Sequence, residues 1–206
     1  MAADATASHW DDTYAAGENA CSWFQQHPDM SLRMLDAARV PAEASVVDVG
    51  GGASPLAGAL LDRGFGDVTV LDISAAGMAH ARRRLGERAA RVQWLDADIR
   101  TWEPPRAYRV WHDRAVFHFL TTAEDRRQYL RALDCATEPG AIAVFGCFAP
   151  DGPMKCAGLP VARYSSLDLA DHLGTQWTLI SHAREEHVTP RDMIEPFCWT
   201  GLRKQA

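Results

Sequence analysis

The residues best suited to chemistry occur in one stretch, Ser45–Ser54, which reads S-V-V-D-V-G-G-G-A-S. Its three consecutive glycines, Gly50, Gly51 and Gly52, let the chain turn sharply and bring backbone N–H groups against a ligand. The β-branched valines before them suit a buried parallel strand, and the proline after them suits the first turn of a helix. This strand–glycine–helix unit predicts a loop that binds a nucleotide cofactor.

Asp48, two residues before the first glycine, separates the cofactor classes that use such a loop. A dinucleotide site admits a pyrophosphate directly behind an apolar strand, and a carboxylate at that point would repel it. The same carboxylate is well placed for a ligand that has a cationic ammonium end and no phosphate. The sequence therefore favours a cofactor of this second kind.

Two more apolar runs end in acidic residues further along the chain. The run V-T-V-L-D-I ends at Asp72 and Ile73, and the run V-Q-W-L-D-A-D-I ends at Asp98 and Ile99. Together with the glycine loop, these segments resemble the first three motifs of the class I S-adenosylmethionine-dependent methyltransferases, and the resemblance covers most of the chain. It implies S-adenosylmethionine as the cofactor.

The resemblance also implies a role for each motif. The acid and the glycines of the first motif would wrap the methionine part of the cofactor. Asp72, with Ile73 beside it, would bind both ribose hydroxyls. Asp98 would accept a hydrogen bond from the adenine amino group, and Ile99 would pack on the ring. One position departs from the family pattern, because Ser54 stands where a third glycine is common.

The end of a fourth apolar run, Tyr108–Arg114, holds two candidates for catalysis. The resemblance places His112 at a strand end beside the methyl group to be transferred. His112 can act as a general base, because an imidazole titrates near working pH, or it can hold the methionine end of the cofactor. Asp113 is the second candidate, and it can equally form a structural pair with Arg114.

Two segments outside the predicted sheet are expected to close the pocket. Residues 1–40 resemble the N-terminal lid of small methyltransferases, in which Trp10, Tyr14 and Trp23 would contact the cofactor. The alternative is that these aromatic side chains only cover the edge of the sheet. Residues 148–165 form the expected substrate loop. The candidate substrate contacts are two residues of this loop and one of the last hairpin: Cys156, Tyr164 and His187.

Helical and strand patterns alternate along the chain, which predicts one α/β domain over residues 1–206. The expected fold has three layers around a Rossmann-like, seven-stranded, mostly parallel sheet, and the resemblance adds that the last strand is antiparallel. The expected strands are Ser45–Val49, Val68–Asp72, Val92–Leu95, Val110–Asp113, Ala141–Cys147, Trp177–Val188 and Pro196–Arg203. The expected helices are Ser31–Arg39, Pro55–Asp62, Ala75–Leu85 and Ala123–Ala136.

Composition excludes several classes of protein. The formal net charge of −6 argues against a surface that follows nucleic-acid phosphates. No apolar run approaches the roughly 20 residues of a membrane span, and the polar start lacks the features of a signal peptide, so a cytoplasmic chain is expected. The five cysteines are scattered without a CxxC pair, and no His-x-x-x-His spacing occurs, so no disulfide framework or metal site is indicated. The oligomeric state is left open.

The sequence thus predicts a methyltransferase that acts on a small-molecule acceptor by in-line displacement. A protein lysine methyltransferase is the alternative, because the run H-W-D-D-T-Y near the N-terminus also resembles some of those enzymes. An NAD(P)-dependent oxidoreductase and a non-catalytic cofactor-binding module stay open as other classes. The short-chain type of oxidoreductase is excluded, because no tyrosine lies four residues before either lysine, Lys155 or Lys204.

Overall fold

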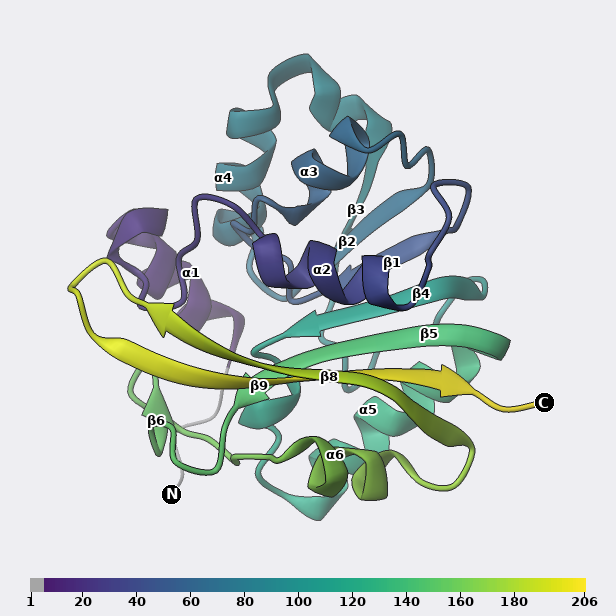
Figure 1. Ribbon diagram of the computed structural model, residues 1–206. Coiled ribbons are helices and arrows are strands. Elements are labelled where there is room, and N and C mark those ends of the chain that lie inside the picture. The colour runs from purple at the N-terminus through teal and green to yellow at the C-terminus, as the bar shows by residue number, and fades with distance from the viewer. Residues whose placement is uncertain (1–5) are drawn as a thin grey trace.

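The computed structural model describes residues 6–206, which form a seven-stranded sheet between two layers of helices (Figure 1). The strands of this sheet are β1 (Val46–Val49), β2 (Val68–Asp72), β3 (Val92–Asp96), β4 (Tyr108–Arg114), β5 (Thr137–Phe148), β8 (Trp177–Val188) and β9 (Ile194–Lys204). They lie in the order β3-β2-β1-β4-β5-β9-β8. The first five pair in parallel, and β9 runs antiparallel to both of its neighbours. The predicted mostly parallel sheet with an antiparallel last strand is confirmed.

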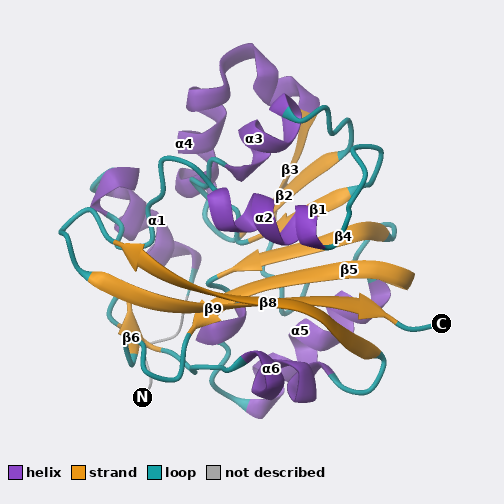
Figure 2. Cartoon of the chain, viewed as in Figure 1, coloured by secondary structure: helices purple, strands orange, loops and turns teal. Residues whose placement is uncertain are grey.

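Helices cover both faces of the sheet, as Figures 1 and 2 show. One face carries α2 (Asp29–Ala37), α3 (Leu56–Asp62) and α4 (Ala75–Leu85), and the other carries α5 (Ala123–Cys135) and α6 (Ser166–Leu173). Each layer buries its own apolar cluster against the sheet. The result is the expected three-layer arrangement.

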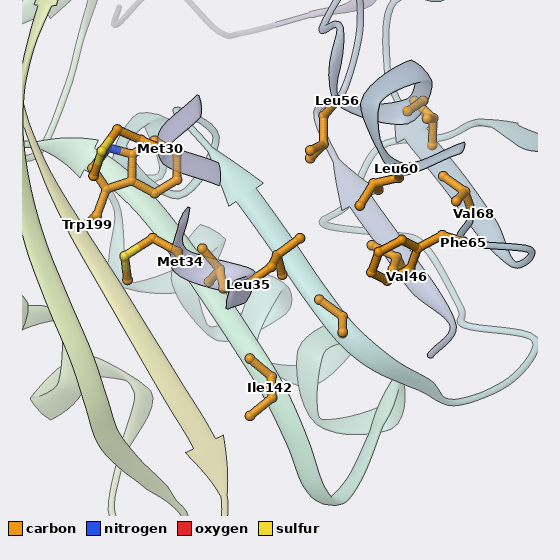
Figure 3. Packing of buried hydrophobic residues seen from close by; sticks show 14 of the residues in the cluster. Met30, Met34, Leu35, Val46, Leu56, Leu60, Phe65, Val68, Ile142 and Trp199 are labelled. Carbon is orange, nitrogen blue, oxygen red and sulfur yellow. The ribbon is translucent and has the colours of Figure 1, made fainter. Parts of the chain in front are cut away.

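The apolar cluster on the α2 side fixes the strands that carry the site. Figure 3 shows Leu60 of α3 and Phe65 gathered beside Val46 of β1. Met34 and Leu35 belong to the same cluster and lie on α2, which packs on β5, β8 and β9. Burying such a side chain stabilises the fold by roughly 1.5–3 kcal/mol. This packing therefore holds the central strands firmly in place, and with them the residues at the strand ends.

A short N-terminal helix, α1 (Ala7–Ala15), lies beside α4 (Figure 1). The Asp11 carboxylate accepts hydrogen bonds from the Ser74 hydroxyl (2.7 Å) and the Ala76 backbone N–H (3.1 Å). Both donors lie at the N-terminus of α4, where backbone N–H groups lack partners within the helix and a negative charge is favoured. Asp11 therefore anchors α1 at the first turn of α4.

The β8–β9 hairpin is long and extends past β5 towards α1 (Figure 1). The segment between β5 and α6, predicted as an irregular loop, contains a second short hairpin, β6 (Lys155–Cys156) with β7 (Leu159–Pro160). Both hairpins thus interrupt the regular alternation of helix and strand. No helix within residues 6–206 is long and apolar enough to cross a membrane.

Most predicted elements agree with the structure to within a few residues. The bounds of β2, α4 and β8 are those expected, and α5 begins after Thr122, whose hydroxyl accepts from the Asp125 backbone N–H. Two helices, α1 and α6, were not predicted. A capping box between Ser165 and Asp168 marks the start of α6, and this pattern is readable in the sequence.

Candidate functional site

A cavity of about 500 Å³ lies at the carboxyl ends of the central strands, where open α/β sheets bind ligands. Gly50, Asp72 and Asp98, which follow or end β1, β2 and β3, line one part of it. Trp10 and Trp23 of the N-terminal segment line another part. A volume of this size suits a small organic ligand. The structure thus brings residues from three predicted motifs and the predicted lid around one cavity.

The glycine loop makes the tight turn from β1 to α3. Gly50 and Gly52 have φ angles of +66° and +39°, in the left-handed region that favours glycine. Gly51 has no room for a side chain, because a Cβ atom there would lie 2.6 Å from the Asp48 Oδ2 atom. The Gly50 N–H donates to the Leu71 carbonyl (2.7 Å), which ties the loop to β2. The turn therefore depends on glycine at all three positions.

Asp72, the last residue of β2, lines the cavity and is buried. Its Oδ1 atom accepts from the Ser74 backbone N–H at 2.7 Å. Burial raises the pKa of the Asp72 carboxyl to about 7, against the opposing effect of backbone N–H groups at Ser74 and Gly52. A ligand that donates hydrogen bonds to this carboxylate would favour its ionised form.

Asp98 lines the cavity further along the strand ends, next to the buried Ile99. Its carboxylate accepts from the Arg100 backbone N–H (2.9 Å) and from the Arg100 guanidinium, with Nη2 at 2.6 Å from Oδ2. Burial opposes ionisation of Asp98, but the hydrogen bonds from Arg100 outweigh it and lower the pKa. Asp98 is thus an ionised acceptor held in a fixed orientation.

Asp48 and His112 form a buried pair across β1 and β4. The His112 Nδ1 atom lies 2.7 Å from Asp48 Oδ1, and His112 Nε2 lies 2.9 Å from the Ser31 hydroxyl of α2. The second oxygen of Asp48 has no hydrogen-bond partner within the described residues. Asp48 and His112 border a smaller hollow of about 40 Å³ beside the glycine loop.

This arrangement bears on the two roles considered for His112. Both of its ring nitrogens are engaged inside the protein, and the side chain does not line the 500 Å³ cavity. A general base has to reach the proton that it removes. In this structure neither ring nitrogen of His112 faces the 500 Å³ cavity, and both roles expected for His112 stay predictions.

Asp113 lies on the opposite face of the sheet from the cavity-facing residues of β4, because successive strand residues alternate. Its carboxylate accepts from the Tyr129 hydroxyl and from the backbone N–H groups of Val116 and Phe117. Burial raises its pKa to about 6. Asp113 does not line the cavity, so the structure places it as an anchor of the turn after β4 and away from the catalytic position expected for it.

Aromatic side chains from two segments meet over the cavity. The Trp10 ring lies 5.9 Å from the Trp23 ring and 4.9 Å from the Phe119 ring, both edge-on, and Tyr14 lies 6.1 Å from Trp23. All four line the cavity. Burial raises the pKa of the Tyr14 phenol, and the nearby charge of Asp72 adds to this effect. The predicted lid residues thus form an aromatic wall of the site.

The three candidate substrate contacts lie in different places. Cys156 is buried and lines the cavity, and burial raises the pKa of its thiol to about 12. His187 is buried outside the cavity lining, with Nε2 at 2.7 Å from the Ser22 carbonyl. Tyr164 packs against Phe117 in the apolar cluster on the α5 side, 5.5 Å between ring centres, so a substrate in this cavity does not reach it.

Sequence reasoning missed the role of Arg114. Arg114 does not pair with Asp113, because adjacent strand residues point to opposite faces. Its side chain lines the cavity and donates from Nη1 to the Trp23 carbonyl at 2.8 Å. The available signal in the sequence was the position of Arg114 at the end of the fourth apolar run, because the ends of parallel strands line the ligand cavity.

Residues 46–140 match the family model described as a methyltransferase domain. This range contains the glycine loop, Asp72, Asp98 and β4. No curated protein sequence matches the chain.

Many solved structures share the fold. One, described with the conversion of a disulfide bond into a thioacetal group during echinomycin biosynthesis, has a TM-score of 0.76 and 21% identity, over 97% of this chain and 92% of that one. The N-methyltransferase NodS from Bradyrhizobium japonicum WM9, in complex with S-adenosyl-L-homocysteine, has a TM-score of 0.75 and 15% identity, over 98% and 100%. The 1,6-didemethyltoxoflavin-N1-methyltransferase of Burkholderia thailandensis has a TM-score of 0.65 and 18% identity, over 100% and 93%.

Proposed function

We propose that this chain, which has the class I methyltransferase fold and matches the methyltransferase domain over residues 46–140, transfers a methyl group from S-adenosylmethionine to a small-molecule acceptor. One observation carries the proposal. The glycine loop, Asp72 and Asp98 follow three neighbouring strands in order and line a single cavity. NodS binds S-adenosyl-L-homocysteine in the same fold, which supports this cofactor class.

The residues of the site fit this cofactor. Asp72 and Asp98 are hydrogen-bond acceptors at successive strand ends, as the ribose hydroxyls and the adenine amino group require. The Asp48 Oδ2 atom is buried and lacks a donor among the described residues, which suits a cationic ammonium group beside the glycine loop. The Asp48 carboxylate beside the glycine loop also disfavours a ligand with a pyrophosphate.

Bound S-adenosylmethionine would supply a methyl group on a cationic sulfonium that a nucleophile can displace in line. The chain's own contribution is alignment and the exclusion of water. Asp72 and Asp98 would hold the nucleoside, and Asp48, oriented by His112, would hold the ammonium end. Trp10, Trp23 and Phe119 give the acceptor part of the cavity an aromatic wall that keeps water out.

Apart from the carboxylates of Asp72, Asp98 and Asp125, the cavity offers little general-base chemistry at neutral pH. No histidine is among its described lining residues. Burial raises the pKa of both the Tyr14 phenol and the Cys156 thiol, so both stay protonated. We therefore infer that the acceptor is nucleophilic without help from a base, as a thiolate or a neutral amine is.

A small-molecule acceptor is favoured over a protein side chain by the site's enclosure. The N-terminal segment contributes Trp10 and Trp23 to the cavity wall, and the β6–β7 hairpin contributes Cys156 and Leu159. The Burkholderia neighbour binds 1,6-didemethyltoxoflavin, a small molecule, in the same fold. A screen with methyl-labelled cofactor against small thiols, amines, phenols and a cell lysate resolved by size separates the two classes. Label in small products supports the proposal, and label confined to protein overturns the acceptor class.

Replacing Asp72 by asparagine is expected to weaken S-adenosylhomocysteine binding roughly 10- to 150-fold, because a hydrogen bond to a charged carboxylate is worth about 1.5–3 kcal/mol. Wild-type affinity should also fall by about tenfold for each pH unit below about 7, since protonation of Asp72 competes with the ligand. The Asp72→Asn protein should lose this slope. Calorimetry between pH 5 and 8 measures both effects.

The same pKa shift predicts a change in stability without ligand. The pKa of Asp72 is 3.8 ordinarily and about 7 in the fold, so the folded state binds more protons between these values. The Asp72 contribution therefore makes the folded protein less stable as pH rises from about 4 to 7.

An Asp72→Asn protein that keeps the wild-type pH profile of binding would contradict the role given to this carboxylate.

Cofactor binding is expected to protect the aromatic lid from chymotrypsin, because closure orders the segment that contains Trp10, Tyr14 and Trp23. Trypsin cleavage at Arg191, exposed in the β8–β9 turn, serves as the control and should not change. Digestion with and without S-adenosylhomocysteine, followed by mass spectrometry, gives both rates. Equal chymotrypsin rates would leave these side chains as ordinary packing.

A further inference from the structure

The β8–β9 hairpin extends beyond the rest of the sheet. β9 pairs with β5 as far as Phe197 and Phe148, whereas Ile194 and Glu195 pair with β8 alone within the described sheet. This overhang reaches towards α1 (Figure 1). His187 of β8 is the cross-strand partner of Glu195, so both side chains lie on the same face of the hairpin. The overhang therefore presents two polar side chains together.

His187 and Glu195 both bind Ser22, which lies in the N-terminal segment. The His187 Nε2 atom donates to the Ser22 carbonyl at 2.7 Å, and the Ser22 hydroxyl donates to Glu195 Oε2 at 3.2 Å. Burial, and then the charge of Arg114, lower the pKa of His187, so its ring is neutral at neutral pH. Its hydrogen lies on Nε2, because a carbonyl can only accept. We call His187, Glu195 and Ser22 the latch.

The latch holds a segment without regular secondary structure. Residues 21–28 contain no helix or strand. Side chains from other elements hold this segment at further points: Arg114 donates to the Trp23 carbonyl at 2.8 Å, and the Gln25 amide donates to Glu185 at 2.9 Å. The position of the segment therefore depends on hydrogen bonds from β4 and from the hairpin.

The residue after Ser22 is Trp23, whose ring lines the 500 Å³ cavity. This ring meets Trp10 of α1 edge-on, with 5.9 Å between the ring centres. Asp11 anchors α1 at α4, and the latch anchors the later part of the lid at the hairpin. His187 is not among the described residues that line the cavity, so it acts on a bound ligand only through this segment.

We propose that His187 and Glu195 are positioning residues, which fasten residues 21–25 of the lid to the β8–β9 overhang and so keep Trp23 in the cavity wall. The proposal goes beyond the proposed function, because the order of this segment is a property of the ligand-free protein. A bound ligand leaves when the lid opens, so a weaker latch gives faster release. Only this consequence for release rests on the proposed function.

Hydrogen–deuterium exchange of the ligand-free full chain, followed by mass spectrometry, tests the latch. In His187→Ala, peptides that cover residues 21–25 should exchange about 2- to 12-fold faster than in wild type, the effect of losing one hydrogen bond on local opening. His187→Gln should keep the wild-type rate, because its amide nitrogen reaches as far from the backbone as Nε2. His187→Asn is one bond shorter and should behave like alanine.

A double-mutant cycle separates the latch from a general effect on the hairpin. Glu195→Ala should speed exchange of residues 21–25 in the wild-type background and add nothing in Ser22→Ala, because both changes remove the same hydrogen bond. His182→Gln is the matched control, since His182 is exposed on the opposite face of β8, and it should leave this exchange unchanged.

Three results would overturn the proposal. The first is equal exchange of residues 21–25 in wild type and a folded His187→Ala protein. The second is faster exchange spread evenly over the whole chain, which indicates a general loss of stability. The third is an effect of Glu195→Ala that persists in Ser22→Ala, and this arm decides the matter if His187→Ala does not fold.

Stopped-flow release of S-adenosylhomocysteine measures the consequence for a ligand. His187→Ala should release it faster by about the same factor of 2 to 12, and His187→Gln should release it at the wild-type rate. An unchanged release rate in a His187→Ala protein whose segment exchanges faster would overturn the role of the latch in retaining a ligand. Failure of wild type to bind S-adenosylhomocysteine removes the proposed function instead, and exchange of the ligand-free protein still decides the latch.

Discussion

Gly52→Val is expected to weaken S-adenosylhomocysteine binding by more than about 100-fold, which corresponds to roughly 3 kcal/mol or more. A Cβ atom at this position would lie 3.0 Å from the Asp72 Oδ2 atom and 2.7 Å from the Tyr14 hydroxyl. The branched side chain would therefore fill the space that a donor to Asp72 needs. The φ angle of +39° adds strain, because β-branched residues avoid this region. Calorimetry gives the affinity, and far-ultraviolet circular dichroism shows whether the variant is folded.

Gly66→Val is the matched control for this prediction. Gly66 is exposed in the loop before β2, and a Cβ atom there would meet nothing within 4 Å. Its binding should equal that of wild type. Gly50→Val should behave like Gly52→Val, because its Cβ atom would overlap the Val116 side chain. Unimpaired binding in a folded Gly52→Val protein would place the cofactor elsewhere.

His112→Ala is expected to lower the free energy of unfolding by about 1–3 kcal/mol, the usual effect of leaving a buried polar group without its hydrogen-bond partner. The substitution would leave Asp48 Oδ1 and the Ser31 hydroxyl without their partner in the interior. Urea unfolding measures the change. His182→Ala, on the exposed face of β8, should change stability by less than about 0.5 kcal/mol.

The same variant separates the two roles of His112. A positioning role predicts weaker cofactor binding together with the loss of stability, since Asp48 is no longer oriented. A general-base role predicts a fall in turnover by about 10²–10⁴ with cofactor affinity little changed. The second pattern would contradict the account of His112 given by the structure.

The sequence predicted well which strand-end residues line the cavity, because these residues carry local signals. Asp72 and Asp98 are recognisable as acids that end apolar runs, and the topology of a parallel sheet brings strand ends together. The positive φ angles at Gly50 and Gly52 explain why these residues are glycines. Each signal spans only a few residues, so none needed knowledge of the packing.

The features that the sequence did not reveal depend on contacts between distant segments. His112 reaches Ser31, 81 positions earlier, and no pattern near either residue marks that contact. The helix α1 is short and buries Tyr14 alone among its described residues, so its anchoring by Asp11 at α4 could not be predicted from periodicity. The face to which a strand residue points also decides its role, and this separates Asp113 from the cavity although it adjoins His112 in the sequence.

Calorimetric titration of the full chain with S-adenosylhomocysteine, and separately with NAD, tests the central claim most directly. The arrangement of Asp48, Asp72 and Asp98 around the cavity predicts saturable one-site binding of S-adenosylhomocysteine. It predicts no comparable binding of NAD, because the Asp48 carboxylate beside the glycine loop repels a pyrophosphate. Tight binding of NAD, or no binding of S-adenosylhomocysteine to the folded protein, would contradict the account.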